Sequence, residues 1–193
     1  MSMLIGFTGL KGSGKDTAAQ VLVKDFDFVR HAFADKLKEG VCRLFNISLE
    51  DLEWLKNQDH AWVQVSSGIL DKHNSYSDNT FRVFLQRFGT EMAREAFGYN
   101  FWIEQWQRSY FELRAMGHNV VVTDVRFENE ATMLRSLQGV IVEITRPGLE
   151  SDGHVSEDPL PRSLVDAQIA NNGSIEALSV DVYDLYKALE RKQ

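Results

Sequence analysis

The chain has 193 residues, of which 44% are hydrophobic and 25% charged, and its formal net charge at pH 7 is −7. This length fits one domain with a full hydrophobic core, and the acidic balance argues against nucleic-acid binding through a broad basic face. The single cysteine, Cys42, and the lack of a signal peptide or a long apolar run predict a cytoplasmic protein without a membrane span.

Short apolar runs alternate with helix-compatible segments along the chain. The runs predicted as strands are residues 4–8, 26–33, 119–124, 140–145 and 167–170. The segments predicted as helices are residues 16–24, 34–45, 49–56, 81–97, 101–116, 128–137 and 175–191. Because strands and helices alternate, we expect an α/β fold in which a five-stranded parallel sheet is sandwiched by helices.

The middle of the chain differs in composition from the rest. Residues 46–118 are dense in aromatic and charged side chains and mostly helical in pattern. We predict a helical insertion there, within a single domain whose core is 1–45 and 119–193. Glycine and two prolines predict a loop over residues 149–162.

The segment from Gly9 to Thr17 has the spacing G-x-x-x-x-G-K of a phosphate-binding loop. Its glycines let backbone N–H groups turn inward, the next helix points its positive end at the phosphates, and the lysine bridges the β- and γ-phosphates. The pattern also lies between a predicted buried strand and a helix, as its mechanism requires. We therefore expect an ATP-binding loop made by Gly9, Lys11, Gly12, Ser13, Gly14, Lys15, Asp16 and Thr17.

Asp16 stands where this motif normally has a Ser or Thr that binds magnesium. Mg²⁺ prefers oxygen ligands and keeps several waters, so Asp16 can hold the metal directly or through water, and Thr17 would contact the α-phosphate. Asp124, at the end of a predicted strand, is the second candidate for holding Mg²⁺. A helix N-cap is the alternative role for Asp124.

An ordered set of motifs resembles the phage deoxynucleoside monophosphate kinases. The matching residues are 14–17 (GKDT), 33–38 (FADKLK), 85–86 (LQ), 89–91 (GTE), 123–130 (TDVRFENE), 146–148 (RPG), 154, 156–157 (SE), 160–161 (LP) and 169–174 (IANNGS). The resemblance implies a P-loop nucleoside-kinase fold with a substrate-binding helical region at about 46–118 and a lid at about 149–165. It also implies ATP- and Mg²⁺-dependent transfer of the γ-phosphate to a deoxynucleoside 5′-monophosphate, giving the diphosphate.

Phosphoryl transfer needs cations besides Lys15, because charge on the transferred group must be neutralised. Arg126 follows the strand end at Asp124, where open α/β sheets place their ligands, and is our first choice for the acceptor phosphate or the transferred group. Its alternative is a salt bridge to Glu128 or Glu130. The catalytic candidates are Lys15, Arg126 and Asp124.

The candidates for binding the acceptor nucleotide are Asp35, Lys36, Arg82, Gln86, Arg126 and His154. Arg82 and Gln86 are four residues apart and share a helix face. Asp35 can also be a helix N-cap, and His154 an ordinary surface residue. For Arg87, two roles stay open from the sequence: a contact with the substrate, or a charged side chain exposed to solvent.

For the base of ATP, Arg146 ends a predicted strand and could stack on adenine, which the resemblance supports. Asn172 and Gly173 would shape the neighbouring edge of that pocket. The expected partners are ATP and the monophosphate, without nucleic acid or membrane, and aromatic residues between 81 and 111 are compatible with a homodimer. If the chain is phage-encoded, it would work in the host cytoplasm.

Two other functions stay open from the sequence. One is a related small-molecule P-loop kinase that resembles phosphomevalonate or dephospho-coenzyme A kinases. The other is a nucleotide-binding switch that does not phosphorylate a metabolite.

Overall fold

The computed structural model describes residues 2–57, 81–151 and 153–192. The chain forms two compact units: the first is Met1–Phe33 with Ile103–Gln193, and the second is Ala34–Trp102. The division falls at other residues than the predicted insertion limits, 46 and 118. Helix α2 (Asp35–Phe45) buries its apolar side in the second unit, and most of helix α6 (Phe101–Ala115) packs in the core of the first. A substrate-binding role for residues 46–118 stays a prediction.

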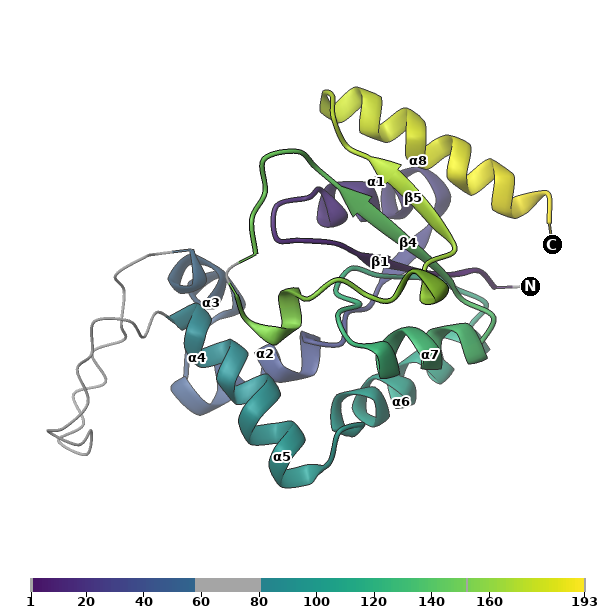
Figure 1. Ribbon diagram of the computed structural model, residues 1–193. Coiled ribbons are helices and arrows are strands. Elements are labelled where there is room, and N and C mark those ends of the chain that lie inside the picture. Colours follow the sequence, from purple (N-terminus) through teal and green to yellow (C-terminus); the bar gives the residue numbers. More distant parts are fainter. Residues whose placement is uncertain (1, 58–80, 152, 193) are drawn as a thin grey trace, which may run out of the picture. The chain divides into compact units, whose positions relative to one another are not determined.

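The first unit contains a five-stranded sheet in the order β2-β3-β1-β4-β5, with every pairing parallel (Figure 1). Its strands are β1 (Leu4–Thr8), β2 (Phe28–Arg30), β3 (Asn119–Val122), β4 (Val140–Thr145) and β5 (Ala167–Ala170). The five-stranded parallel sheet is therefore confirmed. Strand β2 is shorter than the predicted 26–33, because Phe26 ends the preceding helix and Asp27 turns the chain with a φ of 56°.

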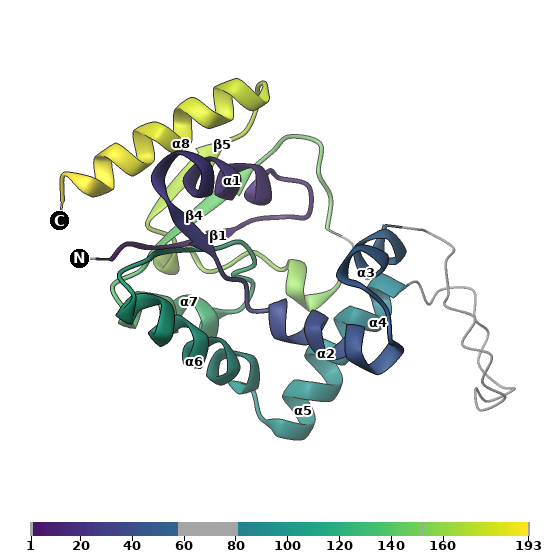
Figure 2. The same cartoon turned by 180° about the vertical axis from the view of Figure 1, so that it is seen from behind.

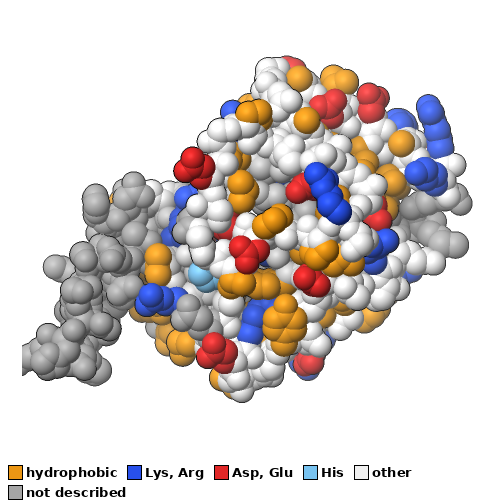
Figure 3. Space-filling model, in the orientation of Figure 1, with side chains coloured by type: hydrophobic (Ala, Val, Ile, Leu, Met, Phe, Trp, Pro, Cys, Tyr) orange, Lys and Arg blue, Asp and Glu red, His pale blue; other side chains and the backbone are white. Residues whose placement is uncertain are grey.

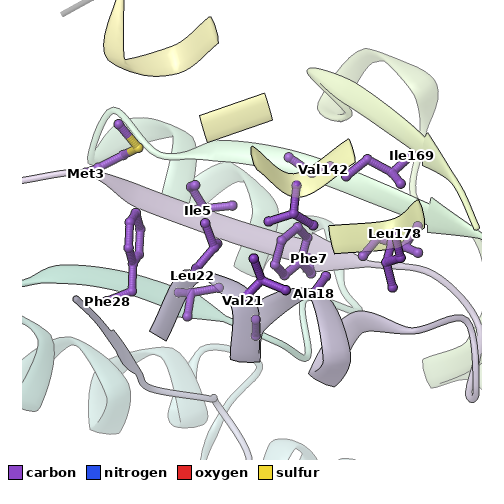
Figure 4. Close-up of a cluster of buried hydrophobic side chains, with 14 residues drawn as sticks. Met3, Ile5, Phe7, Ala18, Val21, Leu22, Phe28, Val142, Ile169 and Leu178 are labelled. Carbon is purple, nitrogen blue, oxygen red and sulfur yellow. The ribbon is translucent and has the colours of Figure 1, made fainter. Parts of the chain in front are cut away.

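Helices cover both faces of this sheet, as predicted. Helices α1 (Lys15–Phe26) and α8 (Ile175–Glu190) lie on one face, and α6 and α7 (Glu128–Ser136) lie on the other (Figures 1 and 2). Side chains of β1 alternate between the two cores, because successive residues of a strand point to opposite faces. Ile5 and Phe7 pack with Leu22 and Leu178 in the first core (Figure 4), whereas Leu4 belongs to the second.

The second unit is helical in the part that the structure describes. It contains α2, α3 (Leu49–Lys56), α4 (Phe81–Arg87), a π-helical turn (Phe88–Met92) and α5 (Ala93–Phe97). Its core consists of buried side chains from these helices and from the beginning of α6, namely Leu37, Val41, Leu52, Phe81, Leu85, Ala93 and Trp102. The π turn interrupts the single helix predicted over 81–97, and there the Gly89 carbonyl accepts the Trp102 indole N–H at 2.6 Å. Residues 71–79 are polar and rich in Asp, Asn and Ser, so the sequence predicts a loop there, and this prediction lies outside the described residues.

Within the described ranges, no helix has both the length and the apolar character needed to cross a membrane.

Helix α6 is fixed to the end of β2 by a buried aromatic contact. Trp106 is fully buried, its Nε1 donates a hydrogen bond to the His31 carbonyl at 2.8 Å, and its ring stacks on the His31 ring. An apolar ring there would leave a buried carbonyl without its donor, which is costly.

We therefore expect Trp106→Phe to lower the free energy of unfolding by about 2–4 kcal/mol, from the unpaired carbonyl and the cavity together. Tyr110→Phe is the matched control on the same helix, because the contact of its hydroxyl among the described residues is a long hydrogen bond from Arg114, at 3.3 Å. That control should cost less than about 1 kcal/mol. Urea unfolding measures both, and equal losses would contradict the assigned role of the indole N–H.

Candidate active site

The phosphate loop, residues 9–17, joins β1 to α1 and lies against the ends of β4 and β5. Gly9 and Gly14 have φ values of 128° and 110°, in the region that favours glycine. A Cβ on Gly9 would lie 2.2 Å from the Ile144 carbonyl oxygen, and one on Gly14 would lie 2.5 Å from Asn171 Nδ2. Only glycine at these two positions lets the loop approach the neighbouring strands so closely.

Lys15 is buried at the beginning of α1, with 8% of its surface exposed. Its ammonium Nζ donates to the carbonyls of Gly9 and Leu10, both at 2.7 Å. Burial, followed by the charge of Arg126, lowers the pKa of Lys15 from 10.5 to about 8. The charged form of Lys15 is therefore disfavoured by its burial, and an anion that binds next to it would stabilise that form.

Three carboxylates oppose this pKa shift. In order of effect they are Glu157, Asp16 and Asp124. Each is close enough to Lys15 to interact with it electrostatically. The first unit therefore brings together the predicted catalytic residues, Lys15, Arg126 and Asp124, with the predicted metal-binding Asp16.

The chain after β3 places Asp124 and Arg126 through specific backbone contacts. Asp124 Oδ1 accepts the backbone N–H of Phe33 at 2.9 Å, so this carboxylate holds the segment after β2 and is not the N-cap of α7. The carboxylate of Glu130 accepts the backbone N–H of Arg126 at 2.8 Å. In the described contacts of Arg126, its guanidinium does not pair with Glu128 or Glu130, the predicted alternative, but with Glu157.

Glu157 lies in residues 149–165, the segment that the sequence predicts to be a lid. It joins this lid segment to the phosphate loop and to the chain after β3. It ends a short 3-10 helix, Val155–Glu157, and is 7% exposed. Its Oε1 pairs with Arg126 Nη1 at 2.5 Å, and its Oε2 accepts the backbone N–H of Lys11 at 3.0 Å. Sequence reasoning placed Glu157 only within a lid motif and missed this contact, because no local pattern reports a pairing between residues so far apart.

His154 shapes the same turn of the lid. Its Nδ1 accepts the backbone N–H of Ser156 at 3.2 Å and lies 2.8 Å from the Ser156 hydroxyl. This contact places Ser156, whose carbonyl accepts from Arg126 at 2.9 Å. A direct contact of His154 with substrate stays a prediction.

A cavity of about 440 Å³ lies within the first unit. Its walls come from the phosphate loop, the segment after β3, the end of β4 and the lid, and include Gly9, Ser13, Arg126, Arg146 and Glu157. Ser13 Oγ is buried and has no hydrogen-bond partner in the described part of the chain. The lining of the cavity thus includes an arginine and the residue that carries this unpaired hydroxyl.

The residues directly after β5 differ in burial: Asn171 is buried, whereas Asn172 and Gly173 are exposed. Asn171 is 8% exposed, and its Nδ2 donates to the Ser13 carbonyl at 2.8 Å, which ties the phosphate loop to β5. Asn172 and Gly173, the predicted residues, are exposed just beyond it. Sequence reasoning missed Asn171, because the run Asn-Asn-Gly does not reveal which asparagine turns inward.

The second unit carries the other predicted substrate residues. Asp35 begins α2, Lys36 pairs with Glu39 at 2.9 Å, and Arg82 Nη2 donates to Asn57 Oδ1 at 3.2 Å. Gln86 lies one turn after Arg82 on α4 and is half-buried.

A cluster of cations surrounds one carboxylate in this unit. Lys38 pairs with Glu53 at 2.7 Å, and Lys56 pairs with the same carboxylate. Burial lowers the pKa of Lys56, and Lys38 and Arg82 lower it further. Among the described residues, three cations therefore lie close together, and two of them share the carboxylate of Glu53.

In the described ranges, no group of three or more His, Cys, Asp or Glu side chains could hold a metal ion. The pair Asp16 and Asp124 fits a different kind of site. Mg²⁺ in nucleotide enzymes is usually held by one or two carboxylates, with waters and phosphate oxygens as its remaining ligands. Both carboxylates interact with Lys15, so these residues fit a magnesium ion that is shared with a nucleotide.

The lowered pKa of Lys15 predicts a pH-dependent stability. Between about pH 8 and 10.5 the unfolded chain holds this proton while the folded protein has released it, so the unfolding free energy rises with pH. Relative to Lys15→Met, the wild type should gain roughly 3 kcal/mol at most across this range, at 1.36 kcal/mol per pKa unit. Urea unfolding of both proteins at several pH values measures the difference, and a constant difference would contradict the lowered pKa.

Comparison with known proteins gives the family. Residues 47–182 match the family model of deoxynucleotide monophosphate kinase. A relative from Acanthamoeba polyphaga mimivirus is 34% identical over an alignment of 190 positions, and the alignment covers 90% of this chain and 91% of that protein. The deoxynucleotide monophosphate kinase of Enterobacteria phage T4 is 23% identical, with 96% of this chain and 99% of that protein covered.

Among solved structures, the Mycobacterium tuberculosis APS kinase CysC in complex with AMPPNP and APS aligns at 16% identity with a TM-score of 0.48, over 96% of this chain and 98% of that chain. The family match and the mimivirus relative decide between the functions left open by the sequence. The chain belongs to the deoxynucleotide monophosphate kinase family, whose members transfer a phosphoryl group to a deoxynucleoside monophosphate.

Proposed function

We propose that this kinase uses ATP, with Mg²⁺, as the donor of the γ-phosphate, and that the phosphate loop with Lys15 and Arg126 carries out the transfer. One observation carries the proposal. In the first unit, Arg126 lies close enough to Lys15 to lower its pKa, and residues of the phosphate loop and Arg126 line the same cavity. Two cations so close together are costly unless anions bind there.

The donor site is assigned to the phosphate loop. Its backbone N–H groups and the buried hydroxyl of Ser13 would donate to phosphate oxygens, and Lys15 would exchange its two carbonyl partners for the β- and γ-phosphates. Arg126 would neutralise the charge that develops on the transferred group. The acceptor phosphate is already an anion, so the transfer needs no general base.

Asp16 and Asp124 would hold the magnesium ion, directly or through water. When bound, this ion neutralises charge on the β- and γ-phosphate oxygens. Arg146 lines the rim of the cavity and is exposed, as a cation that stacks on adenine must be. Asn172 and Gly173 would form the adjacent edge of the adenine site.

Each unit carries its own candidates for contacts with the acceptor nucleotide. In the second unit they are Asp35, Lys36, Arg82 and Gln86, and in the first unit they are Arg126 and His154. The proximity of the cations Lys38, Lys56 and Arg82 supports the assignment in the second unit, because a monophosphate brings about two negative charges at neutral pH. Gln86, on the same helix face as Arg82, would contact the base or the sugar.

The proposal extends to partners and location. Nucleotides are the expected ligands, and mixed acidic and basic side chains on the face in Figure 3 agree with a protein that does not bind nucleic acid. A homodimer is supported by Phe97 and Phe111, which are 71% and 51% exposed, and sedimentation velocity would test it. The location that we propose is the cytoplasm, that of the host if the chain is phage-encoded.

The first kinetic test removes the cation of the phosphate loop. Lys15→Met should lower kcat for ATP with the best deoxynucleoside monophosphate by roughly 100- to 1,000-fold, because a preorganised donor to the transition state is lost. Lys24→Met is the matched control, since Lys24 is exposed at the other end of the same helix.

A coupled assay of diphosphate formation over a panel of deoxynucleoside and ribonucleoside monophosphates gives these values. Two results would overturn the proposal: unchanged turnover in Lys15→Met, or no monophosphate that consumes ATP faster than the reaction without acceptor.

The second kinetic test separates the two substrates. Arg82→Met should raise KM for the monophosphate about tenfold or more, because a hydrogen bond between charged groups is lost, and should leave KM for ATP unchanged. Arg87→Met, on the same helix and exposed, is the control and should change neither value. If Arg82→Met instead raises KM for ATP and leaves KM for the monophosphate unchanged, the assignment of Arg82 to the acceptor is wrong.

A further inference from the structure

The buried carboxylate of Glu157 binds two donors that the phosphates of a nucleotide would also need. One is the backbone N–H of Lys11, inside the phosphate loop, at 3.0 Å from Oε2. The other is the guanidinium of Arg126, whose Nη1 lies 2.5 Å from Oε1. The two oxygens of one carboxylate thus satisfy one donor from the phosphate loop and one from the chain after β3.

The surroundings of Glu157 are poor in water and rich in positive charge. The side chain of Glu157 is 4% exposed, and that of Arg126 is 31% exposed. Lys15 lies close by, and its pKa is raised by Glu157 and lowered by Arg126. Without Glu157, two cations would face each other with less compensation, which is costly in a partly dehydrated site.

An anion that enters the cavity must therefore compete with an anion already present. A γ-phosphate has the same requirements as this carboxylate: oxygens that accept from a backbone N–H of the loop and from an arginine. Each hydrogen bond that such a phosphate makes to Lys11 N or to Arg126 requires that Glu157 give up the same donor.

We propose that Glu157 is an internal substitute for the γ-phosphate, which holds Arg126 and the phosphate loop in position in the nucleotide-free enzyme and is displaced when ATP binds. This inference rests on the proposed function of the phosphate loop and adds a positioning residue to it. Because Glu157 belongs to the lid, its displacement also couples nucleotide binding to a change in the short helix Val155–Glu157.

Glu157→Gln tests the proposal while keeping the size of the side chain. In the amide, an NH2 group takes the place of one carboxylate oxygen, so either Lys11 N–H or Arg126 loses the acceptor that it has in the wild type, and the side chain carries no charge. We expect ATP and inorganic tripolyphosphate, both without metal, to bind about tenfold more tightly to this variant than to the wild type, because a charged competitor is lost. Isothermal titration calorimetry measures both dissociation constants.

Glu150→Gln is the matched control, an exposed carboxylate of the same lid, and should bind both ligands as the wild type does. Equal tightening in the two variants would overturn the proposal, since the effect would then be general charge removal. Unchanged or weaker binding in Glu157→Gln, with a lower thermal stability, would also overturn it and would assign Glu157 to holding the lid alone.

The same titration separates this inference from the proposed function. If the wild type binds ATP and Glu157→Gln binds it no more tightly, the substitution idea fails and the ATP site stands. If neither protein binds ATP or tripolyphosphate, both proposals fail together.

Discussion

The positive charge of Lys15 is buried, and most of the first unit near it is arranged to make that burial tolerable. Glycine at position 9 lets the chain turn so that two carbonyls reach the ammonium, each at 2.7 Å. Asp16, Asp124 and Glu157 add compensating negative charge. Even with these partners the pKa of Lys15 falls to about 8. The nucleotide-free site is thus stable enough to fold and still favours an additional anion.

The parallel sheet brings the other residues of the candidate site to one edge, next to the phosphate loop. The chain leaves β1 into the phosphate loop, leaves β3 into Asp124 and Arg126, and leaves β4 at Arg146. Since all strands run in parallel, these exits meet at the carboxyl edge, where open α/β sheets bind their ligands. Asn171, after β5, then fixes the loop through the Ser13 carbonyl. Residues distant in the sequence become neighbours through topology alone.

Much of this arrangement could be predicted because it follows from local patterns. Strands β1, β4 and β5 begin and end at the predicted residues, since each is a short apolar run with clear turn signals. The phosphate loop was equally clear, because its glycines serve a backbone geometry that few other sequences need.

Long-range pairings could not be predicted in the same way. The contacts of Glu157 with Arg126 and of Asn171 with Ser13 join residues 31 and 158 positions apart. In the π turn, the Gly89 carbonyl accepts from a tryptophan 13 residues later, and no local pattern reports that contact. The limits of the two units, near 34 and 102, depend on which core each helix face enters, and helical periodicity does not contain that information.

The most direct test of the account is a crystal structure with a non-hydrolysable ATP analogue, Mg²⁺ and a deoxynucleoside monophosphate. The account predicts that Lys15 Nζ lies within hydrogen-bond distance of β- and γ-phosphate oxygens and that Arg126 has exchanged Glu157 for a phosphate. A triphosphate bound away from residues 9–17, with Lys15 still on its two carbonyls, would contradict it.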